Sequence, residues 1–285
     1  MKQMNTFIMK TPLKSIKHVI FIAILSTLVL SSCNETPVPI PDFELPNTQR
    51  VVLFEYLTGV KCPNCPKGSN VIKNMLNTFP DKIAVVGVHG RLQTEPLKES
   101  KYDFRTEASR LIEEFHRPFL GKPSAMINRV KFADEPFRAV DLVDLWPSYV
   151  EGELKKPQLI DIALTSLYDK ASRRLNLSLG FLPKVNMAGT YSVSIFVTEN
   201  KIIDLQETIG RIIPDYEHEH VLRHMMTNVT GDDIGTNLSR NNLISKAYSY
   251  TIPSEFVVEN LDIIIAIREN STGYIHQALL TKLDQ

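Results

Sequence analysis

The chain has 285 residues and is balanced in charge, with 32 basic and 32 acidic residues. A formal net charge of zero leaves no basic excess of the kind that nucleic acids attract, so we expect no nucleic-acid partner. The length exceeds what one small α/β unit needs, which predicts two folded domains. Its three cysteines are Cys33, Cys62 and Cys65.

Residues 1–32 have the pattern of a lipoprotein signal peptide. Four lysines precede the apolar segment Val19–Leu30, which is too short to span a bilayer comfortably but has the length of a signal-peptide core. The segment ends in Leu-Ser-Ser-Cys33, which resembles a bacterial lipobox, where the cysteine is lipidated and becomes the first mature residue. An ordinary signal peptide or an uncleaved anchor is the alternative. Removal of these residues leaves 28 basic and 32 acidic residues, a net charge of −4, and an anchor made by lipid alone.

A proline-rich segment and a redox-type motif follow the predicted signal. Residues 33–46 contain four prolines and predict an extended tether. Val51–Leu57 is a β-branched and aromatic run that predicts a strand, and Lys67–Phe79 has helical character. Between them lies Cys62-Pro-Asn-Cys65, at the expected start of the helix.

A cysteine at a helix start favours thiol–disulfide chemistry. The free backbone N–H groups and the helix dipole stabilise a thiolate there, and the two-residue spacing lets Cys65 close a disulfide with Cys62. With Cys33 lipidated, these are the remaining thiols of an exported chain, which indicates that they act as a pair. Two alternatives are a zinc site completed by His89 or His116, and a purely structural disulfide.

The rest of the first half predicts a parallel α/β unit over residues 47–156. Lys82–Val88 is a continuous apolar run typical of a central strand, and it ends at His89, where such sheets gather their chemistry. Tyr102–Phe115 has helical spacing, and residues 137–155 predict a helix that Pro147 breaks or kinks. Pro123 directly precedes a short apolar segment that predicts a strand, whereas no strand follows Pro118 directly.

Residues 157–285 predict an all-β domain, an antiparallel sandwich. Six alternating or β-branched segments are separated by turn residues: Leu159–Leu167, Leu175–Leu179, Tyr191–Thr198, Ala247–Ile252, Leu261–Ile267 and Tyr274–Lys282. Glu217-His218-Glu219-His220 and His224 invite a metal-site interpretation, but no third ligand is identifiable. A surface turn with packed imidazoles is the preferred interpretation, and we expect no metal.

Several segments carry a likeness to known proteins: Glu55–Gly59 before the cysteine motif, His89-Gly90, Asp103–Thr106, Pro123 through Arg129, and His220–Arg223. In these segments the chain resembles the thioredoxin superfamily and, more particularly, the Omp28-related outer-membrane lipoproteins. The resemblance implies a thioredoxin-like domain followed by a β-sandwich, on a lipid-anchored protein of the outer membrane or cell envelope. The motif departs from ordinary thioredoxin because Pro-Asn separates the cysteines and no tryptophan precedes them.

The resemblance also implies roles for individual residues. Cys62 is expected to be exposed and to attack, and Cys65 to be shielded and to resolve the mixed disulfide. Glu55 aligns with the buried acid that exchanges protons with the inner cysteine, and a salt bridge at the rim is the equal alternative. Pro123 aligns with the cis-proline that presents backbone to a substrate; Pro118 is the weaker candidate because no strand follows it directly. His89 is a candidate for tuning the cysteines, although a histidine that only caps the strand is the commoner outcome.

The expected function is thiol–disulfide exchange with envelope proteins that carry thiols or disulfides, without a dissociable cofactor. The alternative is a lipoprotein binding module whose disulfide is structural or vestigial.

Overall fold

The computed structural model describes residues 49–283. The predicted signal peptide, the tether and the lipidation residue Cys33 lie outside these described residues. Within residues 49–283 no helix is long and apolar enough to cross a membrane.

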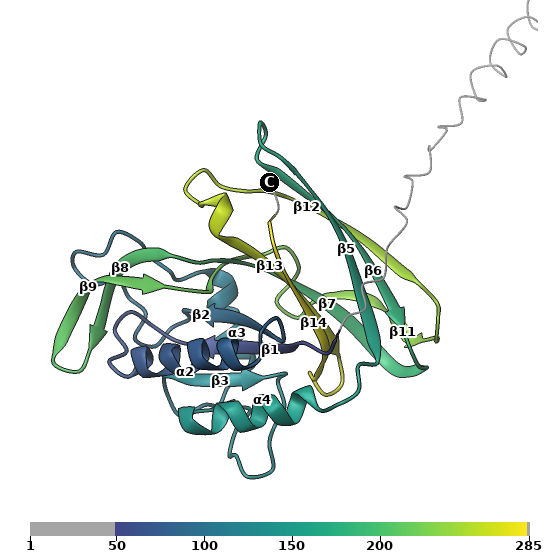
Figure 1. Ribbon diagram of the computed structural model, residues 1–285, viewed down its shortest axis with the longest axis horizontal. Coiled ribbons are helices and arrows are strands. Elements are labelled where there is room, and N and C mark those ends of the chain that lie inside the picture. Colours follow the sequence, from purple (N-terminus) through teal and green to yellow (C-terminus); the bar gives the residue numbers. More distant parts are fainter. Residues whose placement is uncertain (1–48, 284–285) are drawn as a thin grey trace, which may run out of the picture. The chain divides into compact units, whose positions relative to one another are not determined.

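The first half of the described chain places four strands and three helices around a mixed sheet. In chain order these are β1 (Val52–Leu57), α2 (Cys65–Thr78), β2 (Ile83–Val88), α3 (Glu107–Phe115), β3 (Ser124–Ile127), β4 (Ala139–Val140) and α4 (Trp146–Leu154), with a 3₁₀ turn, η1 (Val143–Leu145), before α4. The strand order is β2-β1-β3-β4, of which Figure 1 labels β2, β1 and β3. Strand β1 is parallel to β2 and antiparallel to β3, and β3 is antiparallel to β4.

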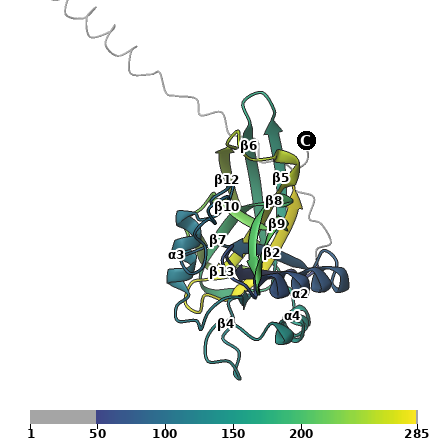
Figure 2. The ribbon, with the colours of Figure 1, turned by 90° about the vertical axis from the view of Figure 1, so that its left-hand side faces the viewer.

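Side chains that alternate along β1 cover both faces of this sheet. Phe54 and Tyr56 pack edge-on against Trp146 of α4, with ring centroids 5.3 and 5.8 Å apart. The same apolar cluster includes residues of α2. Leu53 and Leu57 belong to a second cluster that contains Ile112 of α3. Helices α2 and α4 therefore lie on one face and α3 on the other, as Figure 2 shows.

The helix predicted over residues 137–155 is shorter than expected. A two-residue strand and the turn η1 occupy its first part, and α4 begins only at Trp146. Pro147 lies in the first turn of α4 and does not break it. A proline is tolerated there because the first N–H groups of a helix have no partner within it.

The second half of the described chain is all-β, as predicted. Its strands are β5 (Ile160–Asp169), β6 (Arg174–Pro183), β7 (Met187–Glu199), β8 (Ile202–Thr208), β9 (Arg211–His218), β10 (Val221–Met225), β11 (Asp232–Leu238), β12 (Ile244–Thr251), β13 (Leu261–Glu269) and β14 (Ile275–Lys282), with a 3₁₀ turn, η2 (Val258–Asn260), before β13. All six predicted strands are present, and β8 to β11 are additional.

Two antiparallel layers enclose the core of the second half. One layer is the sheet β12-β6-β5, and the other contains β14-β13-β7-β10, with β11 also paired to β7. Apolar side chains from both layers form one buried cluster, which includes Phe181 of β6, Ile195 of β7 and Ile265 of β13. Strands β8 and β9 form a separate two-stranded hairpin.

One sheet joins the two halves of the chain. Strand β10 lies parallel to β2, and the N–H of Gly87 donates a hydrogen bond to the carbonyl of His220 at 2.6 Å. Gly87 is required at this contact, since a Cβ there would lie 2.9 Å from that carbonyl oxygen. All described residues belong to one compact unit. The predicted boundary at 156/157 falls between α4 and β5, and the independent folding of its two sides stays a prediction.

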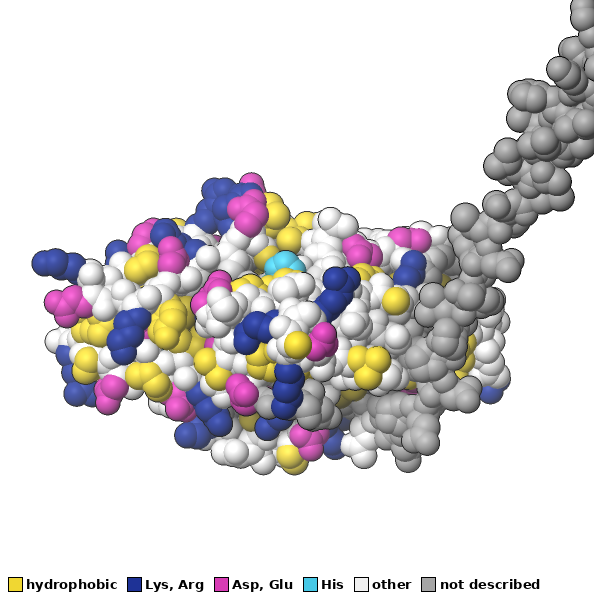
Figure 3. Space-filling model, turned by 90° about the horizontal axis from the view of Figure 1, so that it is seen from above, with side chains coloured by type: hydrophobic (Ala, Val, Ile, Leu, Met, Phe, Trp, Pro, Cys, Tyr) yellow, Lys and Arg dark blue, Asp and Glu magenta, His cyan; other side chains and the backbone are white. Residues whose placement is uncertain are grey.

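Charge is mixed over the surface. Acidic and basic side chains are interspersed on the face drawn in Figure 3, with apolar side chains between them. That face therefore offers no extended patch of one sign of charge.

Candidate functional site

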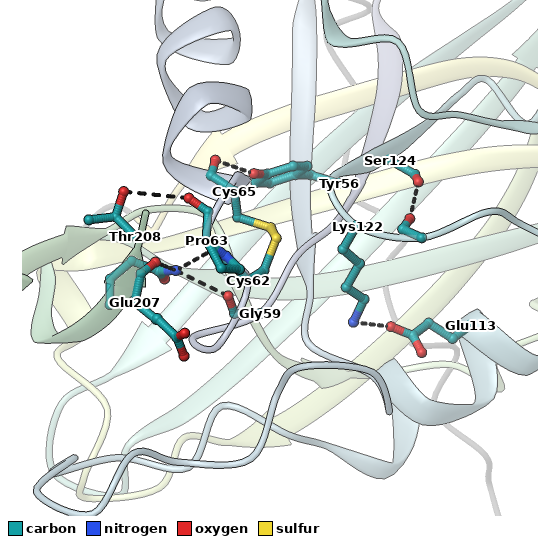
Figure 4. The surroundings of a disulfide bond; sticks show 12 residues. Tyr56, Gly59, Cys62, Pro63, Cys65, Glu113, Lys122, Ser124, Glu207 and Thr208 are labelled. Carbon is teal, nitrogen blue, oxygen red and sulfur yellow. Dashed lines mark hydrogen bonds and ion pairs between the residues drawn. A yellow bond between two sulfur atoms is a disulfide. The ribbon is translucent and has the colours of Figure 1, made fainter. Parts of the chain in front are cut away.

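A disulfide between Cys62 and Cys65 lies between β1 and α2. The two Cα atoms are 5.4 Å apart, and the N–H of Cys65 donates to the carbonyl of Cys62 at 3.1 Å. The hydroxyl of Tyr56, from the end of β1, donates to the carbonyl of Cys65 at 2.6 Å. The bond from Tyr56 ties the disulfide loop to the strand that precedes it (Figure 4).

Both cysteines are buried, so the expectation of an exposed Cys62 is wrong for this disulfide form. The exposed fraction is 0% for Cys62 and 2% for Cys65. Helix α2 begins at Cys65, which places Cys62 in the loop before the helix and not at its first residue. In this loop Cys62 is within reach of strand β8 from the second half of the chain.

The β8–β9 hairpin packs on the disulfide loop (Figure 4). The side-chain amide of Gln206 donates to the carbonyls of Gly59 and Cys62, each at 3.2 Å. The N–H of Glu207 donates to the carbonyl of Val60 at 2.8 Å, and the hydroxyl of Thr208 donates to the carbonyl of Pro63 at 3.4 Å. Four hydrogen bonds thus fasten residues 59–63 to a hairpin more than 140 residues further along the chain.

Pro123 lies directly before β3, the strand that pairs with β1. The peptide bonds before Pro123 and before Pro118 are both cis. Pro123 shares a surface hollow of about 420 Å³ with Asn64 and Lys67, which flank Cys65 in sequence. The backbone before β3 therefore borders the same depression as the start of α2.

A buried ion pair that the sequence did not predict lies in the surroundings of the disulfide. The ammonium of Lys122 contacts the carboxylate of Glu113 in α3, and both side chains have an exposed fraction of 0%. The N–H of Arg91 donates to the same carboxylate at 2.8 Å. Burial lowers the pKa of Lys122, and the opposite charge of Glu113 counteracts this shift. Figure 4 shows the pair in the surroundings of the disulfide.

The side chain of Glu55 does not lie near the disulfide. Its neighbour Tyr56 points to the face of the sheet that α2 covers, so the side chain of Glu55 points to the opposite face. There it forms a fully buried, two-pronged ion pair with Arg129, with N–O distances of 2.7 and 2.8 Å. The structure thus does not bring Glu55 together with Cys65.

His89 is buried immediately after β2. Its ring lies 5.1 Å from that of Phe104 and 6.4 Å from that of His218. Burial lowers the pKa of His89 well below its usual value, and the neighbouring His218 and Lys122 add to the effect. The imidazole is therefore neutral near pH 7 and packs as part of the layer behind the disulfide loop.

The histidines of the second half are separated. His218 in β9 contacts Phe104, His220 occupies a turn with a φ of 59°, and His224 in β10 stacks on Tyr250 at 4.2 Å. Within residues 49–283, no group of three or more His, Cys, Asp or Glu side chains is arranged to hold a metal ion.

The fold and the site define a mostly β protein with a mixed sheet and a disulfide-bonded C-x-x-C loop. The model of the outer membrane protein Omp28 family matches residues 114–279, which is more than half of the chain. The chain belongs to the Omp28 family and is therefore a protein of the outer membrane or cell envelope. The matched range begins after both cysteines, so membership alone does not bear on the disulfide.

Solved structures resemble more of the chain. HBP35 of Porphyromonas gingivalis matches with a TM-score of 0.66 and 13% identity, over 83% of this chain and 76% of that one. A protein from Agrobacterium tumefaciens matches with a TM-score of 0.50 and 12% identity, over 84% of this chain and 99% of that one. At such identities the likeness concerns the fold. No curated protein matches the sequence.

Proposed function

We propose that the chain is a lipid-anchored thiol–disulfide oxidoreductase of the cell envelope, with a thioredoxin-like unit over residues 47–156. The order β2-β1-β3-β4, with β2 parallel to β1, β3 antiparallel to β1 and β4 antiparallel to β3, supports a thioredoxin-like arrangement. So does the position of the helices, because α2 follows β1, α3 precedes β3 and α4 follows β4. The anchor is the lipid on Cys33.

The observation that carries the proposal is the placement of the Cys62–Cys65 disulfide at the start of α2. A thiolate formed at Cys65 would benefit from the dipole of a 14-residue helix, since Cys65 is the first residue of α2. Such stabilisation makes the reduced pair accessible at moderate potentials, which a disulfide that serves only to cross-link the chain does not require.

The exchange then runs in two balanced steps. A partner thiolate attacks the sulfur of Cys62, the Cys62–Cys65 bond breaks, and Cys65 leaves as a thiolate. A second partner thiolate attacks the partner sulfur of the mixed disulfide, and Cys62 leaves. The partner gains a disulfide as Cys62 and Cys65 become a dithiol, and the reverse sequence reduces a partner disulfide.

The backbone before Pro123 is a suitable dock for a partner segment. Residue Lys122 is partly exposed although its side chain is fully buried, which leaves main-chain groups at the surface. An extended partner segment can pair with these exposed main-chain groups by main-chain hydrogen bonds. The adjoining hollow next to Asn64 offers room for its side chains.

The experiment is capture of partners by single-cysteine variants. Cys65→Ser should retain the attacking thiol and accumulate reducible, high-mass mixed disulfides with envelope proteins. Cys62→Ser should capture far fewer. Equal behaviour of the two variants, with no captured partner, would contradict the oxidoreductase proposal.

A second candidate function is a binding module in which the disulfide is structural. The burial of both cysteines and the hydrogen bonds that fasten their loop to the β8–β9 hairpin favour this alternative, because exchange requires the loop to open. In that case the binding surface belongs to the β-sandwich of residues 157–285, and the same capture experiment would give no mixed disulfides with either variant.

A further inference from the structure

The ion pair of Lys122 with Glu113 is buried, and the stability of the fold does not explain why it is there. It is enclosed completely, with both side chains at an exposed fraction of 0%. Removing two charges from water costs several kcal/mol per ion, so a buried pair is weak support for stability. A pair kept under such a cost in the surroundings of a disulfide invites a chemical explanation (Figure 4).

The ammonium of Lys122 is under-satisfied. It carries three N–H donors, and within the described residues its contact is the ion pair with Glu113, with no further hydrogen-bond acceptor. Buried donors are normally paired. A thiolate formed when the Cys62–Cys65 disulfide opens would supply a negative charge in the surroundings of the Lys122 ammonium (Figure 4).

Glu113 is held firmly in its place. The N–H of Arg91 donates to one carboxylate oxygen at 2.8 Å. Gly90 makes room for it, because a Cβ at that position would lie 2.1 Å from the carboxylate carbon. The negative charge that balances Lys122 is therefore fixed by the backbone that follows β2.

We propose that the Lys122–Glu113 pair sets the thiolate affinity of the Cys62–Cys65 dithiol, with Lys122 stabilising the thiolate and Glu113 limiting that stabilisation. The inference deepens the proposed function, on which it rests for its biological purpose. It assigns the buried charges that act on the cysteines to this pair and not to Glu55, for which the resemblance implied proton exchange with the inner cysteine. Lys122 and Glu113 act through their charge and transfer no group.

Other groups face the same region. His89, behind Lys122, is neutral because burial lowers the pKa of its imidazole. Glu95 contributes a weaker attraction to Lys122. Tyr56 donates to the carbonyl of Cys65, and Glu207 lies on the hairpin side of the loop. Among these, the fully buried and oppositely charged pair predicts effects of opposite sign when each partner is neutralised alone.

The test is a titration of the reduced protein by NMR of ¹³Cβ-labelled cysteine. The full chain carries Cys33→Ser, so that Cys62 and Cys65 are its thiols. In this background Lys122→Met should raise the pKa of the thiol that ionises first by about one unit, and Glu113→Gln should lower it by about one unit. Each shift is a roughly tenfold change in thiolate fraction at a pH below the pKa.

Two further variants sharpen the comparison. Glu153→Gln neutralises another buried carboxylate, which pairs with Arg50 next to the opposite end of β1, and should leave the thiol pKa unchanged. The double variant Lys122→Met with Glu113→Gln leaves no buried charge at the pair. It should shift the thiol pKa by less than either single variant does, and Lys122→Gln or Glu113→Leu replaces a single variant that fails to fold.

The outcomes separate cleanly. Shifts of opposite sign in the two single variants support the inference, whereas shifts of one sign or no shifts in them overturn it. A shift in Glu55→Gln with none in Glu113→Gln also overturns it and returns the role to Glu55. The titration needs no partner protein, so it can succeed even if Cys65→Ser captures nothing and the proposed function fails.

Discussion

Substitution of Gln206 should uncover the disulfide. The amide of Gln206 is buried and donates to the carbonyls of Gly59 and Cys62 at 3.2 Å. A net contribution of about 1 kcal/mol per hydrogen bond gives about 2 kcal/mol lost from the closed state in Gln206→Ala. Because 1.4 kcal/mol is a factor of ten, local opening should become up to about 30-fold more frequent.

The assay is the rate at which a small thiol such as dithiothreitol reduces Cys62–Cys65. Where opening is fast relative to attack, this rate follows the open population, so Gln206→Ala should react about 10- to 30-fold faster than wild type. Gln277→Ala is the matched control. Gln277 is equally buried and accepts from the N–H of Val51, but it makes no contact with the disulfide loop. Equal reduction rates for wild type and Gln206→Ala would refute the covering role of the hairpin.

Three other predictions follow from single residues. Cys33→Ser should release the protein from membranes and abolish labelling by a fatty-acid probe; a protein that stays bound and unprocessed would contradict the lipid anchor. Gly90→Ala should lower the free energy of unfolding by about 1–3 kcal/mol in urea titrations, because its Cβ would collide with the carboxylate of Glu113. Burial lowers the pKa of His218 to about 4, so the unfolded chain binds the proton more readily between pH 6.5 and 4. Stability should therefore fall as the pH decreases through this range, and His218→Gln should flatten the fall in melting temperature; an unaltered pH profile would count against this burial.

The parts of the fold that local pattern determines were predictable. The strand before the cysteines, the helix after them and the apolar strand Lys82–Val88 follow from runs of suitable length and residue type. The six β segments of the second half were visible because turn residues separate them. Pro147 was misread, since the sequence alone does not show that the helix starts one residue before it.

The covering of Cys62 was not predictable from one sequence. The glycine at Gly210, between two segments with β-branched residues, is compatible with a hairpin, but nothing in the sequence says where that hairpin packs. The contact joins residues more than 140 positions apart, and tertiary packing decides it. The exposure expected for Cys62 failed for this reason.

The acid near the disulfide was misassigned for a related reason. The two-residue period of a strand places Glu55 and Tyr56 on opposite faces, but the sequence does not show which face α2 covers. Glu113 and Lys122 come from a helix and a loop that are not adjacent to the cysteines in sequence. Their partnership depends on how α3 packs on the sheet.

The reduction potential of the Cys62–Cys65 pair tests the central claim most directly. Equilibration of the full chain carrying Cys33→Ser with glutathione or dithiothreitol buffers gives this value from the fraction of free thiols. The oxidoreductase account predicts a potential between about −270 mV and about −120 mV, the range of thioredoxin-like redox proteins. A value below about −300 mV would mark a structural disulfide and would contradict the account.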